Sequence, residues 1–113
     1  FYCLINSKKE ILFLRNTNLG LFENMHVLPA DGWLKDNHHL DFNIFSINER
    51  FDCGDIKHSF THFDLNSKVI LLKVDDNQIK LKDNCIFIKP ENLDMFSIPT
   101  LYHKIIKLVL KNI

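Results

Sequence analysis

The chain has 113 residues, of which 46% are hydrophobic and 25% are charged, and this is the size and composition of one globular domain. Its 14 Lys and Arg residues balance its 14 Asp and Glu residues, so the formal net charge is zero. This balance excludes a domain that binds nucleic acid through an overall basic charge, because such binding depends on releasing counterions from many phosphates. Any contact with DNA must be local or shared with another domain.

The cysteines and the apolar runs indicate the cellular compartment. Cys3, Cys53 and Cys85 form neither a Cys-x-x-Cys pattern nor an even-numbered disulfide framework, which fits a reducing, cytosolic environment. No apolar run approaches the ~20 residues that span a bilayer, so we expect no membrane partner. The sequence begins at Phe1 inside an apolar segment, and we interpret residues 1–113 as a single domain cut from a longer protein.

The N-terminal half predicts a β-hairpin followed by less regular structure. Phe1–Ile5 and Glu10–Arg15 are apolar runs separated by turn-forming residues, which is typical of two paired strands. Met25–Pro29 resembles a short strand that the proline ends. Ala30–His39 is weakly amphipathic, with Asp31 as a candidate cap, and predicts a short helix.

The C-terminal half predicts several more strands. Asn43–Asn48, Asp55–Phe63, Asn66–Val74 and Cys85–Ile88 are the candidate segments. Only Asp64-Leu65 separates the second from the third, so we expect these two strands to be antiparallel neighbours.

The clearest helix covers Ser97–Lys111, where Ser97 can act as the cap and Pro99 is tolerated in the first turn. Its apolar stripe consists of Leu101, Ile105, Leu108 and Val109, and its other side carries Lys104, Lys107 and Lys111. The order of elements predicts an α+β fold in which helices cover a mixed or antiparallel sheet.

The sequence supports neither a metal site nor a nucleophilic catalytic site. His58 and His62 are about 13 Å apart if both lie on one strand, too far to share a zinc ion. His38-His39, near Asp36 and Asp41, lie in a polar stretch where histidines without a metal are usual. A Cys or Ser nucleophile needs an orienting base and a third residue, and the sequence shows no such set. We therefore assign no metal and no catalytic residue to this chain.

The segment His58–Leu65 concentrates aromatic rings, hydroxyls and imidazoles more than any other part of the chain. Phe60 can stack on bases or wedge between them, the Thr61 hydroxyl can donate and accept hydrogen bonds, and His62 can donate to a base edge or a phosphate. The alternative is that these residues are ordinary sheet positions, with Phe60 in the core and His62 facing solvent.

This segment resembles a motif of the MutY family, the adenine DNA glycosylases that act opposite 8-oxoguanine. Residues 57–65, Lys-His-Ser-Phe-Thr-His-Phe-Asp-Leu, are similar to the His-Thr-Phe-(Ser/Thr)-His-Phe-x-Leu run of the family's C-terminal domain. Arg15 and the stretch from Gly20 through Met25 to Pro29 resemble a second motif, and Ser97-Ile98-Pro99 before the Lys-rich helix resembles a third. The sequence departs from the family at Glu23-Asn24, where the family has a Gly pair, and at His26.

The resemblance implies a Nudix-type, MutT-like fold that lacks hydrolase activity and recognises 8-oxoguanine. By the same resemblance, Phe60, Thr61 and His62 carry lesion recognition, with possible support from His58, Ser59 and Arg15. Phe60 would be the apolar wedge, Thr61 would read the lesion edge, and His62 would contact the lesion strand or its backbone.

The resemblance also implies the partners of this domain. They are duplex DNA that contains 8-oxoguanine opposite adenine, and an N-terminal glycosylase domain of the same protein. The catalytic carboxylates and an iron–sulfur cluster are expected in that N-terminal domain, and we expect no cofactor in this fragment. A bacterial cytoplasmic location, associated with the nucleoid, would follow.

Two other functions share the predicted fold. A Nudix pyrophosphohydrolase needs clustered carboxylates to hold Mg²⁺ against a diphosphate, whereas Glu10, Glu23, Glu49 and Glu91 are widely spaced, so a degenerate hydrolase is the less favoured reading. A protein-interaction or purely structural module of this fold stays open, because the sequence contains no feature that distinguishes it.

Overall fold

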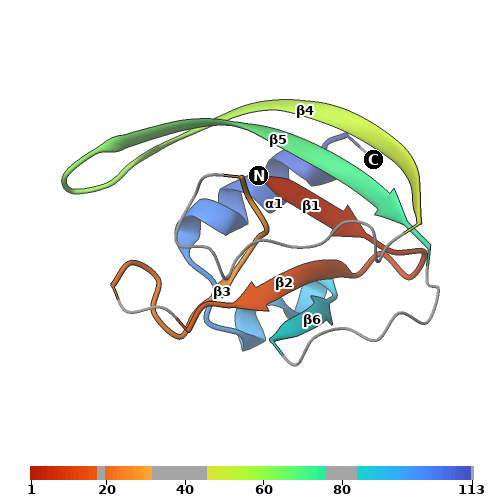
Figure 1. Cartoon of the computed structure of the whole chain (residues 1–113), viewed down its shortest axis with the longest axis horizontal. Coiled ribbons are helices and arrows are strands. Elements are labelled where there is room, and N and C mark those ends of the chain that lie inside the picture. The colour runs from red at the N-terminus through yellow and green to blue at the C-terminus, as the bar shows by residue number, and fades with distance from the viewer. Residues whose placement is uncertain (18–19, 32–45, 76–83, 113) are drawn as a thin grey trace.

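A computed structural model describes residues 1–17, 20–31, 46–75 and 84–112. The described elements comprise six strands, one 3₁₀ helix and one α-helix (Figure 1). In chain order they are β1 (Tyr2–Ile5), β2 (Ile11–Arg15), β3 (His26–Val27), β4 (Ile47–Ser59), β5 (Asp64–Val74), β6 (Cys85–Ile88), η3 (Pro90–Met95) and α1 (Thr100–Leu110).

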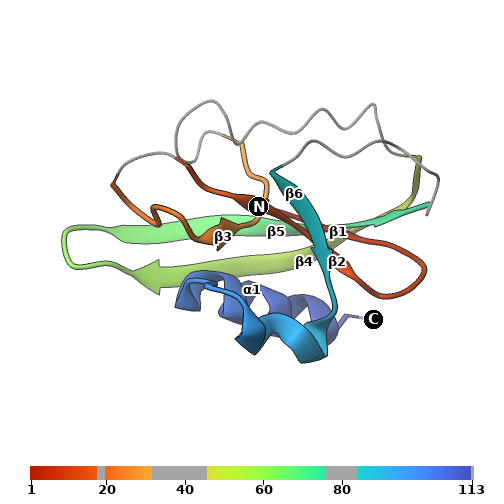
Figure 2. The same ribbon diagram turned by 90° about the horizontal axis from the view of Figure 1, so that it is seen from below.

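The sheet is mixed. Its order is β3-β2-β1-β5-β4, and β6 also pairs with β2. β1 runs parallel to β5 and antiparallel to β2, while the β4–β5 and β2–β6 pairs are antiparallel. With α1 packed beneath the sheet (Figure 2), the predicted α+β class with a mixed sheet is confirmed.

The predicted hairpin at the N-terminus is present as β1 and β2. Asn6 organises its turn, because the Asn6 side-chain oxygen accepts hydrogen bonds from the backbone N–H groups of Lys8 (3.1 Å) and Glu10 (2.9 Å). The short strand near Pro29 is also confirmed, as β3, and the Cys85–Ile88 strand has the predicted bounds.

The β4–β5 hairpin differs from the prediction in two ways. The segments Asn43–Asn48 and Asp55–Phe63 were predicted as separate strands, but residues 47–59 form one strand, and residues 43–45 lie outside the described residues. Register irregularities interrupt the ladder between Asp52 and Asp55, where Gly54 has a φ of +97°. At this irregularity the side chains of β4 no longer alternate strictly between the two faces of the sheet, so a period-two sequence pattern does not continue through it. The turn also falls at residues 60–63, not at 64–65, because Phe60 N–H donates to the Phe63 carbonyl (2.8 Å).

The C-terminal helix is shorter than predicted and is capped differently. α1 begins after Pro99, and Ser97 is not its cap. The Pro99 carbonyl accepts from the Tyr102 N–H (3.0 Å), and a proline before the first turn has no N–H left to satisfy. Of the predicted apolar stripe, the side chains of Leu101, Ile105 and Val109 are buried, whereas Leu108 is only partly buried. Tyr102 and Ile106 are buried as well, so the stripe is centred slightly off the predicted one.

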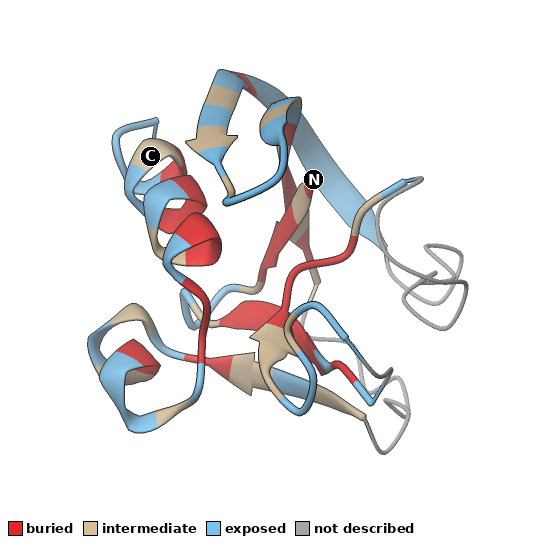
Figure 3. Cartoon of the chain, turned by 90° about the vertical axis from the view of Figure 1, so that its left-hand side faces the viewer, coloured by how far each residue is buried: buried red, intermediate tan, exposed pale blue. Residues whose placement is uncertain are grey.

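The core lies between α1 and the sheet. Figure 3 shows the buried side of α1 turned toward the strands and the exposed side turned away. The largest fully buried side chains of the core include those of Tyr102, Phe13, Leu4 and Leu71. The predicted helix over Ala30–His39 falls mainly on residues 32–45, which lie outside the described residues. Among the described residues, no helix has the length and hydrophobicity needed to cross a membrane.

Candidate functional site at the hairpin tip

The β4–β5 hairpin projects beyond the body of the molecule (Figure 1), and its turn consists of Phe60, Thr61, His62 and Phe63, here called the hairpin tip. The side chains of Thr61 and His62 are exposed, Phe63 is 46% exposed, and Phe60 is partly buried. Thr61 and His62 therefore lie in a turn and are not members of a sheet ladder. The hairpin tip presents a hydroxyl, an imidazole and an aromatic ring together to the surroundings.

A chain of aromatic contacts fixes the hairpin tip to the core. The Phe63 ring stacks on the Phe60 ring, with centroids 4.6 Å apart and planes 24° apart. Phe60 contacts Phe22 (5.9 Å), and Phe22 contacts the fully buried Tyr102 on α1 (5.6 Å). Such ring contacts add stability beyond the area they bury, so the turn is held in place although it projects from the sheet.

His58 supports the hairpin tip from the end of β4. Its ring contacts Phe60 edge-on at 4.8 Å, and its Nδ1 lies 3.0 Å from the Lys104 ammonium of α1. An ammonium can only donate, so Nδ1 is the acceptor and Nε2 carries the proton of the neutral ring. Partial desolvation lowers the pKa of His58, and the Lys104 charge lowers it further, which favours this neutral form.

The remaining predicted site residues are less directly connected. Ser59 is exposed at the last position of β4, directly before the hairpin tip. Arg15 is exposed at the end of β2, where it pairs with His26 of β3. Burial lowers the pKa of His26, and the positive charge of Arg15 lowers this pKa further. Within the described residues, the contacts join Arg15 to β3 and to Asn84, not to the hairpin tip.

The loop that carries Phe22 is organised by a buried asparagine. The Asn16 side-chain amide donates to the carbonyls of Leu21 (2.9 Å) and Phe22 (3.0 Å). The backbone of Asn16 bonds to Met25 and Asn24, at 2.8 Å and 2.7 Å. Phe22 has a φ of 60°, which is uncommon for a bulky residue, and the hydrogen bonds to Asn16 hold it there.

The departure from a glycine pair at Glu23-Asn24 has a structural counterpart. Asn24 has a φ of 61°, in the left-handed region that glycine adopts without penalty and that asparagine tolerates best among the other residues. Asn24 can therefore take the conformation that a glycine would take there.

We expect Asn24→Gly to leave the free energy of unfolding nearly unchanged, because glycine adopts a positive φ without strain. Asn24→Val should cost about 1–2 kcal/mol, because a β-branched side chain is strained at a positive φ. Urea unfolding of the two variants beside the parent protein checks this. Equal losses in both variants would contradict the assignment of Asn24 to the left-handed region.

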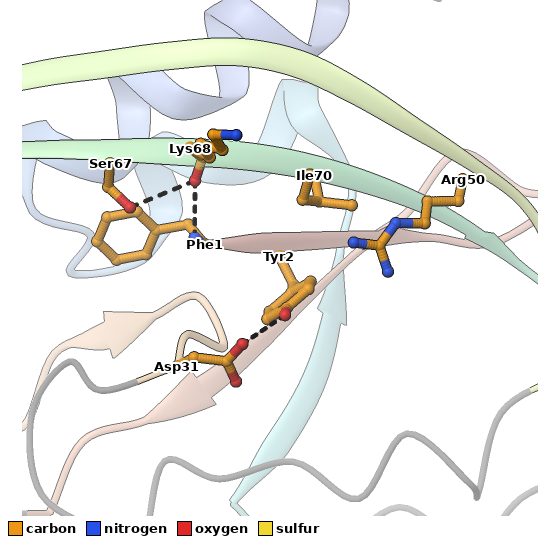
Figure 4. Close-up of a pocket in the computed structure, with 7 residues that line it drawn as sticks. All are labelled: Phe1, Tyr2, Asp31, Arg50, Ser67, Lys68 and Ile70. Carbon is orange, nitrogen blue, oxygen red and sulfur yellow. Dashed lines mark hydrogen bonds between the residues drawn. The ribbon is translucent and has the colours of Figure 1, made fainter.

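A concave feature of the surface lies where residues of β1, β4 and β5 meet. It is an open pocket of about 270 Å³, and Figure 4 shows the residues that line it, namely Phe1, Tyr2, Asp31, Arg50, Ser67, Lys68 and Ile70. The Tyr2 hydroxyl donates to the Asp31 carboxylate at 2.5 Å, and this hydrogen bond, more than burial, raises the pKa of Tyr2. The pocket holds one carboxylate, already engaged by Tyr2, against two cationic side chains. No feature of the sequence pattern indicated it.

Comparison with known proteins places the fold. The profile of the NUDIX domain family matches residues 1–108, nearly the whole chain. The chain belongs to the NUDIX domain family. A search of curated proteins found no significant match to this Nudix domain.

Two solved structures share the fold of the Nudix domain. The MutT protein from Methanosarcina mazei Go1 superposes with a TM-score of 0.53 at 19% identity, over 99% of this chain and 91% of that one. The Nudix hydrolase RenU from M. smegmatis superposes with a TM-score of 0.55 at 5% identity, over 99% of this chain and 83% of that one. These likenesses establish the Nudix, MutT-like fold that the sequence resemblance implied.

The glutamates of this Nudix domain are dispersed. The four glutamates, at positions 10, 23, 49 and 91, are never neighbours on one helical turn, and a magnesium–diphosphate site requires clustered carboxylates. Among the described residues, no group of three or more His, Cys, Asp or Glu side chains could hold a metal ion. The side chains gathered at the hairpin tip are suited to stacking and hydrogen bonding.

Three features of the hairpin tip were not predicted from sequence. Phe63 is its most exposed aromatic ring, whereas Phe60 is packed between Phe63, His58 and Phe22. Lys104 reaches His58 from α1. The Phe22 contact joins segments far apart in the chain, and only the shared aromatic character of Phe22 and Phe60 could have signalled it.

Proposed function

We propose that this Nudix domain recognises 8-oxoguanine opposite adenine in duplex DNA, as the C-terminal domain of a MutY-like adenine DNA glycosylase. One observation carries the proposal. The run that resembles the MutY motif forms an exposed turn at the end of a projecting hairpin, with Thr61 and His62 in solvent. Ordinary sheet positions would have placed these side chains in a ladder.

The chemistry of the lesion suits the Thr61 hydroxyl. 8-oxoguanine differs from guanine by a carbonyl oxygen at C8 and by a proton on N7, so its edge presents a donor where guanine presents an acceptor. A hydroxyl can accept from N7–H, and it can also donate to a nearby oxygen. Backbone groups of the turn can supply further hydrogen bonds to the same edge. Thr61 is thus the residue that distinguishes the two bases.

The two aromatic rings of the hairpin tip have different roles in this proposal. Phe60 is stacked under Phe63 and contacts His58 and Phe22, so it supports the turn from behind. Phe63 is the exposed ring that could stack on or wedge beside a base without leaving its partner. His62 is free to reach the lesion strand or a phosphate. Phe60 acts as a wedge only if it leaves these contacts.

The proposal includes the rest of the MutY-like protein. An N-terminal glycosylase domain with an iron–sulfur cluster would supply the catalytic carboxylates and most contacts to phosphates, in the cytoplasm of a bacterium near the nucleoid. The balanced charge of this chain supports that division, because a neutral domain binds DNA weakly by itself.

The proposal is tested by titrating the isotope-labelled protein with a duplex that contains one 8-oxoguanine:adenine pair and following its amide NMR signals. We expect the largest shifts at residues 59–64, and small shifts at the pocket residues Tyr2 and Ile70. Shifts confined to the pocket, or no shifts up to millimolar duplex, would refute recognition by the hairpin tip.

Hydrolysis is the second candidate function, because one of the two structural neighbours is a MutT protein and the other is a Nudix hydrolase. The dispersed glutamates speak against it. The pure protein should release neither pyrophosphate nor nucleoside monophosphate from nucleoside triphosphates with Mg²⁺, and steady turnover would overturn the recognition proposal in favour of hydrolysis. A partner protein bound without regard to DNA would instead favour an interaction module.

A further inference from the structure

The exposed side of α1 carries only positive charge. Residues 95–113 contain Lys104, Lys107 and Lys111 and no Asp or Glu. All three lysines are exposed, and their spacing of three and four residues places them within about 60° of one another around the helix. The chain as a whole is neutral, so this stripe is a local excess of charge.

The packing of α1 against β4 keeps acidic groups away from this stripe. Ile56 and His58 face α1, whereas Asp55 lies on the other face of β4 by the alternation of the strand. Asp64 shares that other face, because it is paired with Ser59. Within the described residues, no ion pair neutralises the three lysines, and the nearest acidic residues in sequence are Glu91 and Asp94 of η3.

Side-chain contacts connect the lysine stripe to the hairpin tip through His58. The 3.0 Å contact between Lys104 and His58 links the N-terminal half of α1 to the strand that leads into the tip, and His58 itself contacts Phe60. From Lys104 to Lys111 the stripe runs along α1 for about 10 Å, which matches about three phosphates of one DNA strand. A duplex that reaches the hairpin tip has its backbone close by.

We propose that Lys104 and Lys107 of α1, together with Lys111 directly after it, form a binding surface for the phosphate backbone of the duplex whose base contacts the hairpin tip. The proposal rests on the proposed function for the identity of the duplex, but its contacts are independent of the lesion. An anionic membrane fits this surface less well, because the apolar side of α1 is buried against the sheet and cannot insert between lipids.

The test uses fluorescence anisotropy with a labelled duplex at a series of salt concentrations. The variant Lys107→Gln/Lys111→Gln removes two charges from the stripe, and Lys8→Gln/Lys89→Gln removes two exposed charges elsewhere. We expect the first variant to reduce the slope of log K against log salt by about 1–2, because each lost phosphate contact contributes about 0.9. The control variant should keep the parent slope.

The two proposals fail in distinguishable ways. The loss of affinity in Lys107→Gln/Lys111→Gln should be the same for 8-oxoguanine:adenine and guanine:adenine duplexes, since phosphate contacts carry no base information. An unchanged slope, or equal changes in the control variant, would overturn the lysine surface. Binding of the parent protein to phosphatidylserine vesicles but not to duplexes would overturn it too. A reduced slope without any lesion preference would refute only the proposed function.

Discussion

Replacing Thr61 with valine should remove most of the preference for 8-oxoguanine over guanine and leave binding to a guanine:adenine duplex unchanged. Valine keeps the shape of threonine but has no hydroxyl, so the N7 proton of the lesion loses its acceptor. The expected loss is roughly 1–3 kcal/mol, or about 5- to 150-fold in affinity, on lesion duplexes alone. Dissociation constants for the two duplexes, measured with both proteins, check this.

Two controls make the Thr61 result specific. Thr61→Ser keeps the hydroxyl and should retain the preference. Because Thr61 is exposed in a turn, neither variant should change the melting temperature by more than about 2–4 °C. A Thr61→Val protein that melts early and keeps the parent preference would show that this residue serves the fold and not recognition. If this domain is joined to an adenine DNA glycosylase domain, as proposed, the same variant should slow adenine excision only opposite the lesion.

Truncating Ile105 to alanine should produce the largest loss of stability among the changes considered for α1. Ile105 is fully buried between the helix and the sheet, and cavities left by such truncations cost about 2–5 kcal/mol. For a domain of this size each kcal/mol lowers the melting temperature by about 4–8 °C. Thermal unfolding followed by circular dichroism measures the effect.

Neighbouring positions on α1 provide the matched comparison for Ile105. Leu108→Ala should cost less, because that side chain is only partly buried, and Lys107→Ala should change stability by less than about 0.5 kcal/mol. Equal losses in Ile105→Ala and Lys107→Ala would show that the buried face of α1 is assigned incorrectly.

Local patterns in the sequence predict most elements of this fold. The N-terminal hairpin, β6 and the C-terminal helix follow from apolar runs bounded by turn residues, and each spans a single regular segment. The turn of the β4–β5 hairpin was placed wrongly because Phe60 and Phe63 are apolar and resemble strand residues. Their ring stacking stabilises a turn in which neither ring needs a place in the ladder.

The position of the candidate site along the chain can be predicted from the sequence, but the contacts that hold its side chains in place cannot. The density of hydroxyl, imidazole and aromatic groups in the sequence indicates Thr61 and His62 as candidate site residues. The exposed role of Phe63 depends on where the turn closes, and the contact of Phe60 with Phe22 depends on how a distant loop folds around Asn16. Non-local contacts of this kind leave no periodic signal in the chain.

The most direct test of lesion recognition is the ratio of two dissociation constants of the unmodified protein. The two duplexes are identical except that one carries 8-oxoguanine and the other guanine opposite the same adenine, so phosphate contacts cancel in the ratio. Recognition through the hairpin tip predicts tighter binding to the 8-oxoguanine duplex, by about 5-fold or more. Equal dissociation constants for the two duplexes would contradict it.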